Sequence, residues 1–198
     1  MAIINKPENH PVFPEKSKIG VLLVNLGTPE ATDYWSMRKY LKQFLMDKRV
    51  VDIFRPLWWL ILNGPILTFR PSKSGKAYEK IWDKNNHGSP LRKFTINQTS
   101  KLLNVFKNHK NISIDYAMRY GTPEIEKTLN KMTEKGCSKI LLVPLYPQYA
   151  ASTSATVKDE VFKWMLKQRW QPDLRTIAPW FDDKQYINAL AETIKKNI

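Results

Sequence analysis

The sequence has little of what most metal and redox sites are built from. It contains one cysteine, Cys137, in 198 residues, so it cannot form an internal disulfide or a clustered cysteine site for a metal. Its three histidines, His10, His87 and His109, have no spacing suited to one shared metal ion, and we interpret each as a surface residue. The sequence therefore predicts no resident metal and no bound cofactor.

Signatures of nucleotide binding and of hydrolysis are also absent. No GxGxxG or GxxxxGK[ST] motif follows a predicted strand, and neither HExxH nor GxSxG occurs. The longest apolar stretch, residues 56–67, is interrupted by Asn63, Gly64 and Pro65, and it is shorter than the about 20 residues that span a bilayer. Residues 1–17 contain three prolines and lack the apolar core of a secretion signal, which indicates a flexible arm on a cytoplasmic protein.

Acidic residues are few. The chain has 18 Asp and Glu against 32 Lys and Arg, a net charge of +14, and between Arg38 and Lys80 ten cations face three acids. Such a surface attracts acidic lipid, nucleic acid, or carboxylate and phosphate ligands. Nucleic acid is the weakest of these interpretations, because the aromatic residues cluster at Trp58 and Trp59 instead of alternating with cations along the chain. We expect no nucleic-acid partner.

Apolar runs predict four strands, at 19–25, 112–120, 138–146 and 174–180. Helical patterns follow each strand, so we expect an α/β fold with a parallel four-stranded sheet and helices on both faces, forming one domain over residues 18–198. About 85 residues separate the first two strands, and they predict an insertion with helices near 32–46, 52–62, 73–82 and 90–110. Thr28 is predicted to cap the first of these helices, because Pro29 and Glu30 follow it.

Ligands of such sheets bind outside the carboxyl ends of the strands. The residues predicted there are Asn25, Met118, Arg119, Tyr120, Tyr146, Gln148, Tyr149, Ser152 and Thr153. An arginine can pair with a carboxylate through two hydrogen bonds, tyrosine rings offer stacking faces, and hydroxyls beside a helix N-terminus favour an anion. Together they indicate a flat, partly aromatic, anionic ligand. A structural interpretation stays open for each: a cap for the hydroxyls, an ion pair for the arginine, packing for the tyrosines.

Four segments, in this order, closely resemble the amino-terminal half of the ferrochelatase family: KIGVLLVNLGTPEATDYWSMRKYLKQFLMDKRVVD, YEKIWDKNNHGSPL, YAMRYGTPEIE and LLVPLYPQYAASTSAT. The family inserts ferrous iron into protoporphyrin IX, with iron as a substrate. The resemblance implies a chelatase fold of two similar halves with the porphyrin between them. It also implies a porphyrin-binding wall formed by Asn25, Leu26, Ser89, Arg119, Tyr120, Tyr146, Gln148, Tyr149, Ser152 and Thr153. Ala150 departs from the small hydroxyl residue often found in the family after the second tyrosine.

The family's catalytic histidine and glutamate have no counterpart in this sequence and are expected beyond Ile198. We therefore interpret the chain as the porphyrin-wall half, inactive alone and partnered by a missing carboxyl-terminal half. The alternative is a stand-alone α/β module that binds a carboxylated or phosphorylated small molecule at the same sheet edge.

The apolar stretch within residues 56–67 also has two interpretations. Taken alone, it predicts a buried amphipathic helix of the insertion. The resemblance implies instead a lip at the mouth of the cleft, formed by Trp58, Trp59, Leu60, Ile61 and Leu62. In that interpretation the lip touches the membrane, while Arg55, Arg70, Lys73 and Lys76 meet acidic head groups.

Overall fold

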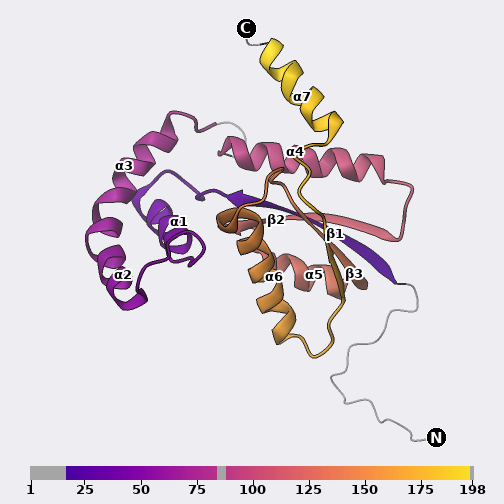
Figure 1. The fold of residues 1–198 in the computed structure, drawn as a ribbon, viewed down its shortest axis with the longest axis horizontal. Coiled ribbons are helices and arrows are strands. Elements are labelled where there is room, and N and C mark those ends of the chain that lie inside the picture. The colour runs from indigo at the N-terminus through magenta and orange to yellow at the C-terminus, as the bar shows by residue number, and fades with distance from the viewer. Residues whose placement is uncertain (1–16, 84–87, 197–198) are drawn as a thin grey trace, which may run out of the picture.

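The computed structural model describes residues 17–83 and 88–196, so the proposed arm lies outside the described residues except for Ser17. Figure 1 shows the arrangement of the elements. The elements are β1 (Lys18–Gly27), α1 (Tyr34–Leu45), α2 (Arg55–Ile61), η1 (Leu62–Ile66), α3 (Leu67–Glu79), α4 (Pro90–Val105), β2 (Ile112–Tyr120), α5 (Ile125–Glu134), β3 (Cys137–Pro144), η2 (Ala151–Ala155), α6 (Thr156–Lys167), β4 (Asp173–Thr176) and α7 (Lys184–Lys195).

The four strands form one parallel sheet in the order β2-β1-β3-β4, which confirms the predicted fold class and the helical insertion between β1 and β2. Strand β1 lies inside the sheet and its residues Leu22, Leu23 and Val24 are at most 1% exposed. Helices cover both faces of a parallel sheet, so a central strand is apolar throughout and does not alternate. This is why the first strand gave the clearest signal in the sequence.

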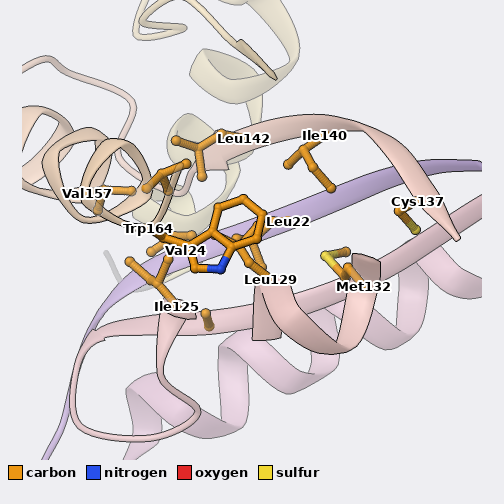
Figure 2. Packing of buried hydrophobic residues seen from close by; sticks show 12 residues of the cluster. Leu22, Val24, Ile125, Leu129, Met132, Cys137, Ile140, Leu142, Val157 and Trp164 are labelled. Atoms are coloured by element: carbon orange, nitrogen blue, oxygen red, sulfur yellow. The ribbon is translucent and has the colours of Figure 1, made fainter. Parts of the chain in front are cut away.

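Helices α5 and α6 cover one face of the sheet and α4 lies on the other face (Figure 1). The main core lies between the sheet and helices α5 and α6. It consists of Leu22, Val24, Ala117, Ile125, Leu129, Met132, Cys137, Ile140, Leu142, Val157, Val161 and Trp164. Figure 2 shows the indole of Trp164 in the middle of this cluster, and its Nε1 donates to Asn130 Oδ1 at 2.7 Å. Helix α6 therefore packs through the face that carries Val157, Val161 and Trp164.

The insertion folds around a second apolar cluster: Met37, Tyr40, Leu41, Leu45, Trp58, Leu62, Leu67 and Tyr120. Helices α2 and α3 are joined across a kink at η1, where Gly64 has non-helical backbone angles and Pro65 follows it. Helix α3 packs closely against the loop that precedes α1, because a Cβ at Gly75 would lie 2.2 Å from the carbonyl oxygen of Thr32. The third predicted helix begins at Leu67, six residues earlier than expected.

Two further predicted boundaries are wrong. The first helix begins at Tyr34 and not directly after Thr28, because the Asp33 side chain accepts hydrogen bonds from the amides of Trp35 and Ser36 at 2.9 and 3.0 Å, while Thr28 is buried under the loop that follows β2. The fourth strand ends at Thr176 and not at residue 180, because the chain beyond Ile177 no longer pairs with β3.

Helix α7 differs from the other helices, because none of its residues is buried. It projects away from the sheet in Figure 1. Its apolar residues Ile187, Leu190 and Ile194 are between 46% and 57% exposed. None of the helices in the described part of the chain is both long and apolar enough to cross a membrane.

Candidate functional site

The loops after β1 and β2 cross in backbone contact at the carboxyl edge of the sheet. Gly27 has φ +102°, and a Cβ there would lie 1.7 Å from the carbonyl oxygen of Tyr120. Gly121 has φ +88°, and a Cβ there would lie 2.6 Å from the carbonyl oxygen of Thr28. Only glycine has both the left-handed conformation and the missing side chain that this crossing needs. The two similar GTPE segments are therefore the two halves of one crossing.

A hollow of about 540 Å³ lies beside this crossing, between it and α1. It is lined by Thr28, Pro29, Glu30, Trp35, Ser36, Lys39, Tyr40, Lys42, Gln43, Gly121, Thr122 and Glu124. The Thr28 hydroxyl is buried and has no hydrogen-bond partner among the described residues. Aromatic faces next to lysines suit a ligand with an apolar body and anionic groups. We call this hollow the strand-edge hollow.

A second hollow, of about 650 Å³, runs along α3. It is lined by Pro65, Ile66, Phe69, Arg70, Lys73, Ser74 and Ala77. The Phe69 ring is 74% exposed, and neither Arg70 nor Lys73 forms an ion pair with a described residue. Two unpaired cations flank an apolar surface here. We call it the α3 hollow.

Arg119, the predicted carboxylate-binding arginine, is already paired within the protein. Its side chain is 8% exposed and forms an ion pair with Asp47, while its Nε donates to Thr156 Oγ1 at 2.6 Å. The guanidinium also lies 4.4 Å from the centre of the Tyr120 ring. The prediction that Arg119 is free to clamp a ligand carboxylate is wrong for this structure, because burial and pairing with Asp47 occupy its charge.

Asp47 is the acceptor at the centre of this group. Its Oδ2 accepts from Arg119, from the Thr156 hydroxyl and from the Tyr120 hydroxyl, the last at 2.9 Å, and its Oδ1 accepts from the Arg49 amide at 2.8 Å. Burial alone would raise the pKa of Asp47, but the hydrogen bonds from Thr156, Arg49 and Tyr120 and the charge of Arg119 outweigh it, so this pKa lies below its ordinary value. Burial raises the pKa of Tyr120 to about 12.

Three residues of the predicted porphyrin-binding wall, Asn25, Leu26 and Ser89, make contacts within the protein. Asn25 donates from Nδ2 to Thr95 Oγ1 at 3.1 Å, and its Oδ1 accepts from the Leu26 amide at 2.9 Å. Leu26 packs against the second apolar cluster. Ser89 is 3% exposed and stands at the N-cap of α4, but its side chain makes no capping hydrogen bond. Asn25 and Leu26 lie near the carboxyl end of β1, Ser89 lies at the start of α4, and the role of all three in binding stays a prediction.

The residues after β3 are divided between buried and exposed positions. Burial raises the pKa of Tyr146, whose hydroxyl has no hydrogen-bond partner among the described residues. Tyr149 lines the same small hollow as Tyr146 and is 58% exposed, and Gln148 is exposed as well. Ser152 and Thr153 are partly buried in η2, where the Thr153 hydroxyl donates to the Ala150 carbonyl at 3.3 Å. In this structure the Thr153 hydroxyl therefore stabilises the start of η2.

The five residues of the proposed lip have different environments. Trp58 and Leu62 are 9% and 0% exposed, and Trp58 Nε1 donates to the Leu45 carbonyl at 2.8 Å. The assignment of these two to the membrane-facing lip is wrong, because they form the core that attaches α2 to α1. Trp59, Leu60 and Ile61 are 51%, 61% and 37% exposed. Helical geometry places them on the other side of the same short helix.

Asp47 was not among the predicted site residues, and Arg70 and Lys73 were predicted only to meet acidic head groups. Asp47 could have been noticed as one of only three acids among ten cations between Arg38 and Lys80. An isolated carboxylate in such a region is a candidate partner for a buried cation. No group of three or more His, Cys, Asp and Glu residues within 17–83 and 88–196 is placed to hold a metal ion.

The fold and this edge define an α/β chain with an open, cation-bearing site at the carboxyl end of a parallel sheet. The ferrochelatase family model matches residues 18–198. Curated relatives include the ferrochelatase of Agrobacterium fabrum, 50% identical over 97% of this chain, and that of Allorhizobium ampelinum, 51% identical over 100%. The ferrochelatase of Rhizobium meliloti is 51% identical over 91% of the chain. This chain belongs to the ferrochelatase family.

The chain covers 56% of the Agrobacterium protein and 57% of the Allorhizobium protein, so it spans about half the length of the curated relatives it matches.

Proposed function

We propose that this chain is the porphyrin-binding part of a ferrochelatase, which inserts ferrous iron into protoporphyrin IX. The family match over residues 18–198 carries the proposal. Protoporphyrin IX is a flat apolar macrocycle with two carboxylates. The two hollows provide what such a ligand needs, namely aromatic and aliphatic surface beside lysine and arginine side chains.

Within this proposal the carboxylates bind in the α3 hollow. Arg70 and Lys73 stand one turn apart on α3, both exposed and both without an ion-pair partner in the described ranges. The macrocycle lies against apolar residues such as Phe69 and Ile66. Insertion of a metal also requires a base for two pyrrole protons. None of the described residues that line the two hollows is a histidine, and we assign that step to the part of the ferrochelatase relatives that this chain does not cover, as the resemblance implies.

The proposal is tested by titrating the chain with protoporphyrin IX and following the fluorescence of its seven tryptophans. We expect saturable quenching, and we expect the double variant Arg70→Ala/Lys73→Ala to bind at least tenfold more weakly, because two charge-assisted hydrogen bonds are lost. Lys76→Ala is the matched control, since Lys76 is exposed on the same helix but does not line the hollow.

A second ligand separates the porphyrin ring from its carboxylates. The dimethyl ester of the same porphyrin is expected to bind the wild type and the double variant equally. Lack of quenching by protoporphyrin at micromolar concentrations, with retained binding of small phosphates or carboxylates, would instead favour the stand-alone anion-binding module.

We also propose that α2 contacts an acidic membrane surface. Leu57, Trp59 and Leu60 are each more than half exposed on this helix, and the sequence around it is strongly basic. Apolar side chains inserted at the interface and cations at the head groups reinforce each other. We expect co-sedimentation with vesicles containing phosphatidylserine, and we expect Trp59→Ser/Leu60→Ser to abolish it. Equal binding of the variant and the wild type would contradict this proposal.

A further inference from the structure

Asp47 lies in the loop between α1 and α2, through which the chain enters the apolar part of the insertion. Its contacts reach two distant segments: the end of β2, through Arg119 and Tyr120, and the first residue of α6, Thr156. The three segments are separated by more than 30 residues in the sequence. One carboxylate therefore joins the insertion, the strand edge and the helix that follows β3.

The geometry leaves little freedom in this group. Thr156 is fully buried, and its hydroxyl accepts from Arg119 Nε while it donates to Asp47, so donors and acceptors alternate around the group. The side chains of Asp47 and Arg119 are each 8% exposed. Glu160 is the only other described acid paired with Arg119, at 3.5 Å with its side chain 33% exposed. Loss of Asp47 would leave the arginine buried without its main counter-charge.

The strand-edge hollow is built directly on this group. Its lining includes Gly121, the residue that follows Tyr120, and Lys42 and Gln43 near the end of α1, four or five residues before Asp47. The Gln43 side chain accepts from the Gly121 amide at 2.9 Å. A shift of the loop that holds Asp47 would therefore move both α1 and the crossing of the two glycine loops, which form opposite walls of the hollow.

We propose that Asp47 is a positioning residue for porphyrin binding. It acts through Arg119, Tyr120 and Thr156, and it fixes the loop that leads into α2 and α3 against the end of β2. This inference rests on the proposed function. Asp47 itself touches no ligand in this arrangement, because its carboxylate oxygens are used by groups within the protein.

A nearby ion pair offers a matched control. Arg49, two residues after Asp47, pairs with Asp159, three residues after Thr156, so this pair joins the same loop to the same helix. It differs in being exposed, with side chains 39% and 33% accessible. An exposed pair contributes little, whereas a buried cluster with several donors to one oxygen fixes its members. Asparagine at position 47 could not replace the carboxylate, because it is neutral and has one acceptor oxygen. If that oxygen accepts from Arg119, Tyr120 and Thr156, the amide nitrogen faces the Arg49 amide, which is also a donor.

The experiment measures the dissociation constant of protoporphyrin IX from tryptophan quenching in the 198-residue chain, well below the unfolding temperature of every variant. We expect Asp47→Asn to bind at least tenfold more weakly and Asp159→Asn to stay within twofold of the wild type. Val161→Ala, in the main core, controls for lost stability and is expected to bind within twofold. Thr156→Ser, which keeps the hydroxyl, is expected to bind within threefold, and Thr156→Val at least tenfold more weakly.

The outcomes separate this inference from the function on which it rests. If the wild type fails to quench, the proposed function fails and the positioning role fails with it. If the wild type binds but Asp47→Asn binds within twofold, only the positioning role is wrong. Equal weakening by Val161→Ala and Asp47→Asn would also overturn it, since stability alone would then explain the loss. If Asp47→Asn does not fold, the Thr156→Ser and Thr156→Val pair decides, and equal affinities of that pair overturn the proposal.

Discussion

The main core between the sheet and helices α5 and α6 is closed by apolar side chains, whereas the insertion is joined to the sheet by buried polar groups as well as by an apolar cluster. In the main core the buried residues recur with the period of their own strand or helix. In the insertion the decisive contacts, such as Asp47 with Arg119 and Trp58 with the Leu45 carbonyl, follow no local period. The main core is therefore specified by the local apolar pattern of the sequence, whereas the insertion is specified by contacts between residues that are apart in the sequence.

The largest expected effect is in the main core. Trp164→Ala removes a side chain that is 1% exposed and leaves a large cavity, so we expect the free energy of unfolding to fall by about 3–5 kcal/mol. Urea unfolding followed by circular dichroism measures this change. Leu166→Ala is the control on the same helix, where the side chain is 81% exposed and a change within about 0.5 kcal/mol is expected.

The contribution of Asp47 to the free energy of unfolding should depend on pH. The pKa of Asp47 is lowered in the folded protein, so its ionised form contributes stability that is present above its ordinary value of 3.8 and is lost as the pH falls through the lower folded value. We expect Asp47→Asn to lose about 3 kcal/mol of unfolding free energy at pH 7. The difference from the wild type should shrink below pH 3.8. Urea unfolding at pH 7 and pH 3 measures it, and a constant difference would contradict the assignment.

The adjacent tryptophans allow a smaller test within α2. Trp58→Phe keeps an aromatic ring but removes the donor to the Leu45 carbonyl, so a loss of about 1–2 kcal/mol is expected. Trp59→Phe should change the unfolding free energy by less than about 0.5 kcal/mol, because Trp59 is half exposed. Similar losses at both positions would mean that α2 is packed differently.

The smallest effect should come from the helix caps. Asp33 caps α1 and Asp183 caps α7, each by accepting two backbone amides. Asp33→Ala should cost about 1 kcal/mol of global stability, since α1 is part of the second cluster. Asp183→Ala should reduce helix content without changing the main unfolding transition, because no residue of α7 is buried. Hydrogen exchange of the two helices distinguishes these outcomes.

Much of the fold could be predicted because the strands of a covered parallel sheet are continuous apolar runs. Residues 112–120 were predicted as a strand and form β2 with the same bounds, and the helix expected after the third strand is present as α6. The start of the first helix was not predictable from Thr28, because both Thr28 and Asp33 have capping side chains. Burial of Thr28 beneath the second glycine loop decided between them.

The sequence predicted the sheet edge at which the candidate residues lie, and their role in binding stays a prediction. The strand edge followed from the parallel topology, whereas the crossing of the two glycine loops at that edge was not predicted and is seen only in the structure. The partner of Arg119 was not apparent, because 72 residues separate it from Asp47. Trp58 and Trp59 look alike in the sequence, and the helix orientation alone places one in the core and the other in solvent.

The sequence by itself determined the sheet, the order of its helices, the excess of positive charge and the membership of the ferrochelatase family, since all of these depend on local pattern or on motifs along the chain. The tertiary structure alone decided which charges are neutralised. Arg119 is buried and forms an ion pair with Asp47, whereas Arg70 and Lys73, beside an apolar hollow, form no ion pair with any described residue. Electrostatic energy depends on distance in space and on burial, and neither can be read from separation along the chain.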